Sequence, residues 1–291
     1  MAFNSPIEWC DHTFNPWIGC TKISPACDHC YAEAYDKRFG GSRWGPKAAR
    51  IRTSADNWKK PLSWNRKAEK EGVRYRVFCA SLADVFDNHN SIEQGWRDDL
   101  WELIDATPNL DWLLLTKRPQ NIRGMVPWEW FFPTNVWIGT TVEDQKTADQ
   151  RIKYLTQIPQ AVRFISSEPL LGPVDLSNVE WFDGLRFNAL EGQLHDKKGF
   201  VFKLNWVIAG GESGPNSRAS FPDWFTSLRD QCAFASVPFF FKQWGDWVPG
   251  EFTDRGGWAM NRVGKRKASP LLDGALHQAF PTVATQWEAG S

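Results

Sequence analysis

The sequence predicts an α/β protein built as a partial (β/α) TIM-type barrel of about six to seven parallel strands. Apolar runs of strand length recur along the chain, and each is followed by polar or glycine-rich residues and then by a helical pattern. The runs are continuously apolar, which is typical of parallel strands that helices cover on both sides. Polar residues follow most of the runs, at the edge where such barrels carry their chemistry.

The expected elements follow from these runs and from helix capping patterns. Strands are predicted at residues 7–10, 76–80, 111–116, 136–141, 162–167, 204–209 and 238–241. Helices are predicted at residues 31–39 and 92–106, near Asp144 and from Pro222. Ser91 and Gln94 form a capping-box pattern before the second of these helices.

Two segments interrupt the alternation of strands and helices. Residues 178–203 are polar, rich in glycine and mixed in charge, so we expect an insertion. The barrel is assigned to residues 1–249, with a cysteine loop at residues 15–31. Residues 250–291 are expected to form an irregular C-terminal extension that packs on the barrel.

Composition limits the possible functions. No apolar run reaches the length of a membrane span, and residues 1–10 do not show the basic region followed by an apolar run that is typical of a signal peptide. A cytoplasmic protein without membrane contact is therefore expected. Six cysteines in 291 residues are too few for a disulfide scaffold. No G-x-G-x-x-G motif follows the first strand and no P-loop motif is present, which argues against dinucleotide and ATP binding.

Charge is balanced overall but unevenly placed. The chain has 34 basic and 34 acidic residues, whereas residues 37–76 contain 13 basic and 3 acidic residues, a net charge of +10. Trp44, Trp58 and Trp64 lie in the same segment. Cations beside aromatic rings suit contact with phosphates and stacking on bases. The alternative is a solvated surface with tryptophans anchored in the core, which the charge pattern alone favours slightly.

Three cysteines are concentrated in the loop at residues 15–31. Cys20, Cys27 and Cys30 have the spacing C-x6-C-x2-C. Thiolates this close together indicate a metal or an iron–sulfur cluster. A zinc site would need a fourth ligand, which Cys10, His12 or His29 could supply. Three cysteines alone would leave one iron of a cubane cluster open, and the spacing does not decide between the two.

The chain resembles the phage and bacterial three-Cys-motif protein family, a divergent family of radical S-adenosylmethionine enzymes. The segments that carry the resemblance are 15–31, 114–119, 167–173, 206–214, 238–244 and 271–274. The usual radical S-adenosylmethionine spacing is C-x3-C-x2-C, so three extra residues separate Cys20 from Cys27 here. His29 stands where an aromatic residue usually precedes the last cysteine.

The resemblance implies a cofactor and a reaction. Cys20, Cys27 and Cys30 would bind three irons of a [4Fe-4S] cluster, and S-adenosyl-L-methionine would chelate the fourth. Reduction by a flavodoxin-like or ferredoxin-like electron donor would release a 5′-deoxyadenosyl radical that abstracts hydrogen from a substrate. The basic segment and the phage association favour a nucleic-acid base or nucleotide as substrate, in DNA modification or repair. The alternatives are a zinc-stabilised, non-catalytic nucleic-acid-binding protein and a radical enzyme that acts on a peptide or protein.

Residues at the strand ends are candidates for binding S-adenosylmethionine. Ser81 or Asp84 would receive its ammonium group, and Lys117 or Arg118 its carboxylate. The other candidates, which include groups suited to the ribose and the adenine, are His29, Tyr31, Thr140, Glu143, Ser167, Glu168, Gly210, Gly211 and Glu212. Each of these residues has a purely structural alternative as a helix cap, a turn glycine or an ion pair.

Two further assignments concern the substrate. Cys79, at the end of a strand, is either a hydrogen donor to a substrate radical or a small buried apolar residue, and the second role is the commoner one. Lys242, Gln243 and Trp244 follow the last strand and either contact the substrate or close the barrel.

Overall fold

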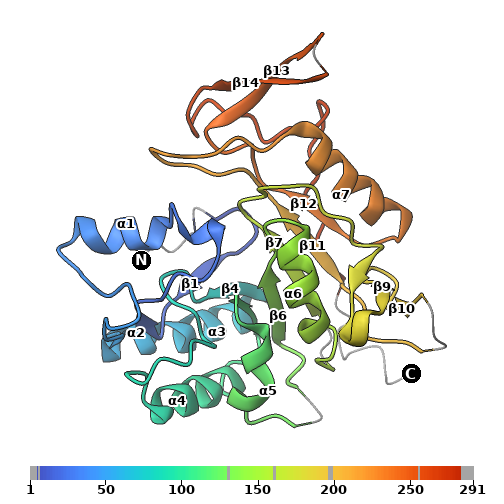
Figure 1. Cartoon of the computed structure of the whole chain (residues 1–291). Coiled ribbons are helices and arrows are strands. Elements are labelled where there is room, and N and C mark those ends of the chain that lie inside the picture. The colour runs from blue at the N-terminus through green and yellow to red at the C-terminus, as the bar shows by residue number, and fades with distance from the viewer. Residues whose placement is uncertain are drawn as a thin grey trace.

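The computed structural model describes residue 5 and residues 7–129, 132–159, 162–195, 199–254 and 256–282. Its centre is a seven-stranded, all-parallel sheet that curls into a half-barrel (Figure 1). The strand order is β1 (His12–Phe14), β4 (Tyr75–Cys79), β5 (Leu110–Thr116), β6 (Val136–Thr141), β7 (Val162–Ser167), β11 (Trp206–Ala209) and β12 (Phe239–Phe241). The predicted fold class, a partial (β/α) barrel, is confirmed.

Six of the seven predicted strands agree with the structure to within two residues. The first prediction is wrong, because residues 7–10 form a turn and the strand begins only at His12. Trp9 and Cys10 are buried, but they pack against the concave face of the sheet and do not extend it. The apolar pattern of residues 7–10 therefore reflects a buried turn, and the sequence alone does not distinguish such a turn from a short strand.

Helices lie between the strands along the chain. They are α1 (Tyr31–Arg38), α2 (Ala55–Trp58), α3 (Lys60–Glu71), α4 (Gln94–Asp105), α5 (Ile122–Met125), α6 (Gln145–Leu155) and α7 (Pro222–Phe234). The start of α6 is confirmed, since Asp144 and Thr147 form a reciprocal capping box. The capping box predicted for α4 is wrong: Glu93 is its N-cap, and the Ser91 hydroxyl accepts the Arg50 backbone N–H.

The two faces of the sheet bury different cores. Val77 and Cys79 of β4 belong to the large cluster that contacts the helices. Phe78 points the other way, into a concave-face cluster in which Trp206 makes edge contacts with Trp9 and Trp137. This cluster, hereafter the aromatic plug, contains Trp9, Cys10, Phe78, Leu113, Trp137, Val162, Phe164, Trp206, Ile208 and Phe240. It fills the concave side of the half-barrel, and the polar residues that follow the strands lie at the carboxyl edge of the sheet.

One glycine is required by the plug. A Cβ atom on Gly139 of β6 would lie 2.4 Å from the Phe164 ring, so only glycine lets this ring cross the neighbouring strand.

Three small sheets lie outside the half-barrel. The insertion forms an antiparallel sheet of β8 (Val179–Glu180), β9 (Arg186–Asn188) and β10 (Gln193–Leu194). β2 (Trp17–Ile18) pairs with β3 (Ile51–Arg52). The tail was predicted to be irregular, but β13 (Trp247–Thr253) and β14 (Gly257–Arg262) form a hairpin that projects from the body (Figure 1). No helix in the described part of the chain is long and apolar enough to cross a membrane.

Candidate active site at the cysteine loop

The cysteine loop leaves the end of β1 and lies across the carboxyl edge of the sheet. Asn15 starts it, and its side chain is buried. The Asn15 amide donates to the Ser81 hydroxyl at 3.0 Å, and its oxygen accepts the Leu82 backbone N–H at 2.6 Å. The loop is thus tied to the end of β4. It continues through the 3₁₀ turn η1 (Pro25–Cys27) to Cys30, which is the N-cap residue of α1.

The six cysteines fall into two groups. Cys20, Cys27 and Cys30 are partly exposed, whereas Cys10, Cys79 and Cys232 are buried. All six are free thiols. In the described part of the chain, no three His, Cys, Asp or Glu side chains are already arranged to hold a metal ion. The three loop cysteines are therefore partly exposed, and their thiols are not preassembled around a single point.

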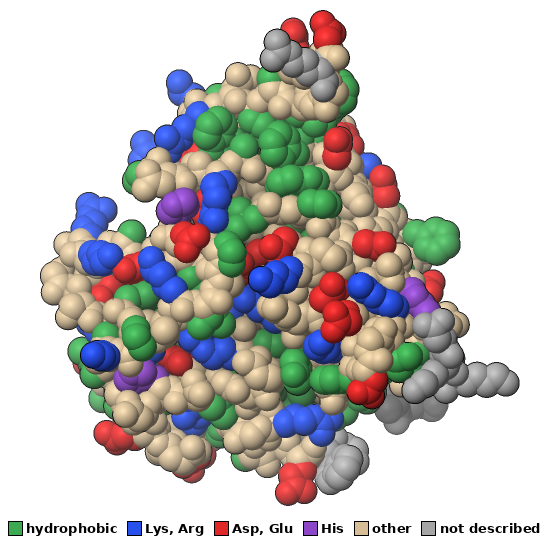
Figure 2. All heavy atoms as spheres, in the orientation of Figure 1, with side chains coloured by type: hydrophobic (Ala, Val, Ile, Leu, Met, Phe, Trp, Pro, Cys, Tyr) green, Lys and Arg blue, Asp and Glu red, His purple; other side chains and the backbone are tan. Residues whose placement is uncertain are grey.

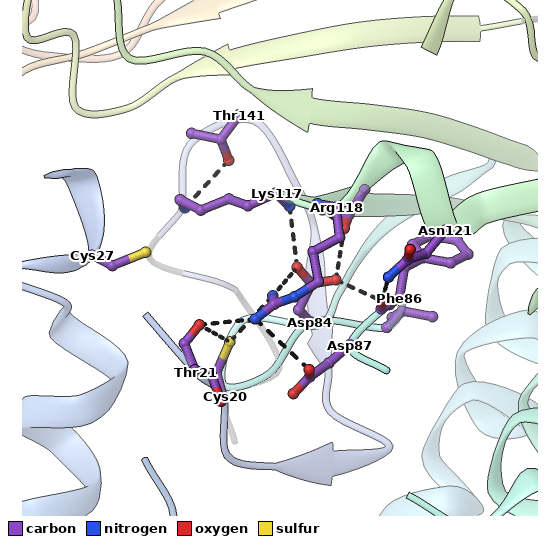
Figure 3. Close-up of polar contacts among 12 residues, drawn as sticks. Cys20, Thr21, Cys27, Asp84, Phe86, Asp87, Lys117, Arg118, Asn121 and Thr141 are labelled. Carbon is purple, nitrogen blue, oxygen red and sulfur yellow. Dashed lines mark hydrogen bonds and ion pairs between the residues drawn. The ribbon is translucent and has the colours of Figure 1, made fainter. Parts of the chain in front are cut away.

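Arg118 connects the first cysteine to the sheet (Figure 3). It follows β5, and its Nη1 lies 3.8 Å from the Cys20 Sγ and 2.9 Å from an Asp84 carboxylate oxygen. Its Nη2 donates to the Thr21 carbonyl at 2.9 Å and lies 3.7 Å from Asp87. Arg118 was one of two candidates for the S-adenosylmethionine carboxylate, and Asp84 was one of two candidates for its ammonium group. In the structure these two side chains are paired with each other.

Arg50 and Asp87 extend this network, and neither residue was picked out from the sequence. The Arg50 guanidinium donates twice to Asp87, at 2.8 and 2.9 Å, and once to the Thr21 hydroxyl at 2.6 Å. Two buried arginines therefore face two buried carboxylates, which leaves the network close to neutral. Burial raises the pKa of the Cys20 thiol to about 12, and Asp84 adds to this effect while Arg118 opposes it.

Glu143 holds the second part of the loop. It follows β6, and its fully buried carboxylate accepts the Ala26 backbone N–H at 3.0 Å and also bonds the Ser24 hydroxyl. Arg151 of α6 donates to the same carboxylate at 3.0 Å. Glu143 was a candidate for binding S-adenosylmethionine, and in the structure it bonds the turn that presents Cys27.

Glu212, after β11, anchors the loop next to Cys30. Its carboxylate lies 3.3 Å from the His29 Nδ1 and receives two hydrogen bonds from the Arg218 guanidinium, at 2.6 and 2.9 Å, and one from the Arg218 backbone N–H at 2.7 Å. Arg218 also donates to the Pro25 carbonyl at 3.0 Å. Burial alone would raise the pKa of Glu212, but the hydrogen bonds from Arg218 outweigh it and the pKa is lowered. The sequence predicted Glu212 and His29 as site residues, but it did not identify Arg218.

Inward-pointing side chains form a polar tier above the aromatic plug. Glu168 is its centre: it pairs with Lys242 at 2.9 Å and accepts the Trp9 indole N–H at 2.9 Å and the Ser166 hydroxyl at 3.1 Å. Lys117 also lies at this edge, with its ammonium 3.4 Å from the Thr141 hydroxyl. Both lysines and Glu168 were predicted from the ends of their strands.

Other predicted residues have structural partners. Tyr31 donates its hydroxyl to the Ser81 carbonyl at 2.6 Å, and Thr140 donates to the Thr116 carbonyl at 2.8 Å. The Ser167 hydroxyl is buried and has no hydrogen-bond partner among the residues that the structure describes. The Trp244 indole donates to the Leu271 carbonyl at 2.8 Å, which supports its alternative role in closing the barrel.

The two glycines and Gln243 are also placed by the backbone. A Cβ atom on Gly211 would lie 1.9 Å from the Trp244 carbonyl oxygen, and one on Gly210 would lie 3.3 Å from a Glu168 oxygen. Gly211 therefore allows two backbone segments to approach each other, and its N–H donates to the Gln243 carbonyl at 2.9 Å. Cys79 is fully buried in the cluster that contacts the helices, which favours its alternative role as a core residue.

The basic segment at residues 37–76 is largely neutralised by acidic partners. Eight of its basic residues form ion pairs, six of them with acidic residues outside the segment. Trp64 stacks on His12, and Trp58 packs against Phe14. Figure 2 accordingly shows basic and acidic side chains interleaved across the visible face. These contacts support the alternative of a solvated surface with anchored tryptophans.

Comparisons with known proteins identify a family without a known activity. A search of curated proteins and a search of solved structures each found no match. A family model described as "Protein of unknown function (DUF5131)" matches residues 4–281. Since the match extends over nearly the whole chain, the protein belongs to the DUF5131 family.

Proposed function

We propose that the protein is a radical S-adenosylmethionine enzyme that holds a [4Fe-4S] cluster through Cys20, Cys27 and Cys30. The observation that carries the proposal is the division of the cysteines: only these three are partly exposed, and all three lie on one loop at the carboxyl edge of the half-barrel. Structural cysteines are normally buried, as the other three are.

The donor set fits an iron–sulfur cluster in its chemistry. Soft thiolate ligands suit iron–sulfur clusters, and three thiolates leave one position for another ligand. Because no metal group is preassembled among the described residues, the loop would have to draw its thiols together on loading. With S-adenosylmethionine bound, such a cluster supplies one-electron chemistry that cleaves the sulfonium and yields a hydrogen-abstracting radical.

The residues of the chain would order and shield this site. Arg118, Glu143 and Glu212 hold the loop at three separate points. Lys117 is the better candidate for the S-adenosylmethionine carboxylate, since among the described residues its ammonium has one long contact, whereas Arg118 is paired with aspartates. The aromatic plug excludes water from beneath the site.

A nucleic-acid base or nucleotide remains the proposed substrate. The support is the part of the basic segment that is not neutralised. No ion pair is formed within the described part of the chain by Arg38, Lys47, Lys60, Arg66 or Lys70. These cations are available for phosphate contacts, whose strength would fall with salt concentration. A flavodoxin-like or ferredoxin-like protein would supply the electron.

Anaerobic reconstitution with iron and sulfide tests the proposal. We expect a brown protein that forms 5′-deoxyadenosine from S-adenosylmethionine when a reductant is added. Cys27→Ala should abolish the colour and the product, whereas Cys232→Ala, which alters a buried thiol in α7, should retain both. A colourless protein with stoichiometric zinc would refute the proposal and favour a zinc-stabilised binding protein.

A further inference from the structure

A cavity of about 370 Å³ opens next to the first cysteine. It lies between the cysteine loop, the segment around Pro46 and the loop at residues 87–90, and Thr21 and Arg118 line it. Thr21 directly follows Cys20, so the cavity adjoins the proposed cluster loop. Its volume is within the range of about 300–1,000 Å³ that is typical of small-molecule sites.

Charged groups at the base of the cavity are already compensated. Arg118 and Asp87 line it and are 6% and 2% exposed. Arg118 pairs with Asp84 as well, and Asp87 pairs with Arg50. An anion would therefore find no unpaired positive charge on these buried residues, and an uncharged polar ligand is the better match.

The sides of the cavity offer a rigid ring and apolar surface. His89 lines the cavity, and its imidazole is held at both nitrogens. Its Nε2–H donates to the Pro46 carbonyl at 3.1 Å, so Nδ1 is the acceptor of the Ser91 hydroxyl at 2.8 Å. Pro46 and Ile23, which is 44% exposed, provide apolar walls. A flat ring has surfaces here on which to stack.

Two asparagines supply hydrogen-bonding groups to the cavity. Asn88 and Asn90 line the cavity and are exposed. Within the described part of the chain, no hydrogen bond involves either side-chain amide. Each amide offers a donor and an acceptor side by side, which is the arrangement that reads the edge of a nucleobase.

We propose that this cavity binds the nucleobase of the substrate, with the ring among His89, Ile23 and Pro46 and its polar edge on Asn88 and Asn90. The identification of the ligand as the substrate rests on the proposed radical function, whereas the binding itself does not. Because the buried charges that line the cavity are compensated, the nucleobase should supply most of the affinity and the 5′-phosphate of a single nucleotide should add little. The cations proposed above to contact phosphates would act on the neighbouring phosphates of a longer nucleic acid.

Calorimetric titration of the full-length protein with guanosine, cytidine and thymidine tests the proposal without a cluster. Adenosine is left out, because a site for S-adenosylmethionine would bind it too. At least one nucleoside should bind, and its 5′-monophosphate should bind within about threefold of it. Asn88→Ala combined with Asn90→Ala should weaken binding roughly tenfold or more, from the loss of the edge contacts.

Two controls make the result specific. Asn178→Ala, at an exposed asparagine of the insertion, should leave nucleoside affinity unchanged. Indole riboside retains a stacking ring but lacks the polar edge, and it should bind the unmodified protein as weakly as the double variant binds the nucleoside.

The proposal is overturned if no nucleoside binds at millimolar concentration, or if binding is indifferent to the double variant. Binding of a short uncharged peptide in place of nucleosides, lost in the same variant, would also overturn it and would indicate a peptide substrate. Formation of 5′-deoxyadenosine is measured separately, so failure of the nucleobase site is distinguishable from failure of the radical function.

Discussion

Arg118 Nη1 lies 3.8 Å from the Cys20 sulfur while the same nitrogen donates to Asp84 at 2.9 Å. One guanidinium therefore joins the first cysteine of the loop to the carboxyl ends of β4 and β5. It does so from a position where it is almost completely buried. Its role is to position the cysteine, because the planar fork reaches a thiol, a carbonyl and a carboxylate together.

Replacing Arg118 by Met should destabilise the protein by about 3–5 kcal/mol, because it leaves Asp84 buried without its counter-ion. Arg118→Lys retains the positive charge but loses the planar guanidinium and some of its hydrogen bonds, so it should lower the free energy of unfolding by roughly 1–3 kcal/mol. Urea unfolding measures both changes. The control is Arg66→Met, at an exposed position of α3, which should stay within about 0.5 kcal/mol of the unmodified protein. An Arg118→Met variant as stable as the control would contradict the positioning role.

Glu143→Gln should loosen the part of the loop that presents Cys27. The neutral amide retains the shape of the side chain, but it loses the charge that Arg151 neutralises and one acceptor for the Ala26 N–H. Hydrogen exchange should therefore accelerate roughly tenfold at the Ala26 amide, equivalent to about 1.4 kcal/mol. Glu102→Gln, on the exposed face of α4, is the matched control. Unchanged exchange at Ala26 would show that Glu143 does not order the loop.

The Glu212–Arg218 pair predicts a specific dependence of stability on pH. The pKa of Glu212 is lowered in the folded protein, because the hydrogen bonds from Arg218 outweigh the effect of burial. The ionised Glu212 carboxylate therefore stabilises the fold fully at pH values above its unfolded-state pKa of about 4.3. This stabilisation is lost as the pH falls through the folded-state pKa of Glu212.

Arg218→Gln should therefore cost about 1–2 kcal/mol at pH 7, and this difference from the unmodified protein should shrink below about pH 4. Urea unfolding across this pH range measures the difference. Arg66→Gln is the control: its difference in unfolding free energy from the unmodified protein should not change with pH. A constant Arg218→Gln penalty from pH 7 to pH 3 would mean that the pair does not titrate as the geometry requires.

Six strands of the central sheet were predictable, because buried parallel strands are continuous apolar runs. The error at residues 7–10 arose because Trp9 and Cys10 satisfy the same apolar pattern while filling the concave face. The hairpin of β13 and β14 was missed because none of its strand residues is buried and its strands include Pro249 and Gly250.

The site was predictable as a set of strand ends but not as a set of partners. Parallel strands bring Asp84, Lys117, Glu143 and Glu168 to one edge, and this follows from topology alone. Which of them pair with each other depends on side-chain direction. Lys117 lies two residues after the inward-facing Leu115, on the same side of the strand, whereas the Arg118 side chain contacts Asp84 and the cysteine loop. Arg50 and Arg218 lie outside strand ends, so no pattern distinguished them from surface arginines.

The side-chain direction of Cys79 was also not predictable from the sequence. Its two possible roles, hydrogen donor to a substrate radical and buried core residue, can be tested. Its neighbour Phe78 faces the aromatic plug, so Cys79 faces the helices, where burial raises its thiol pKa. Cys79→Ala should cost about 1 kcal/mol and retain substrate turnover in the reconstituted enzyme, while Cys79→Ser should cost about 1–3 kcal/mol by burying a hydroxyl. Urea unfolding and product formation measure the two effects. A Cys79→Ala enzyme that makes 5′-deoxyadenosine normally but releases no product would restore Cys79 as the hydrogen donor, because core packing alone cannot separate these two readouts.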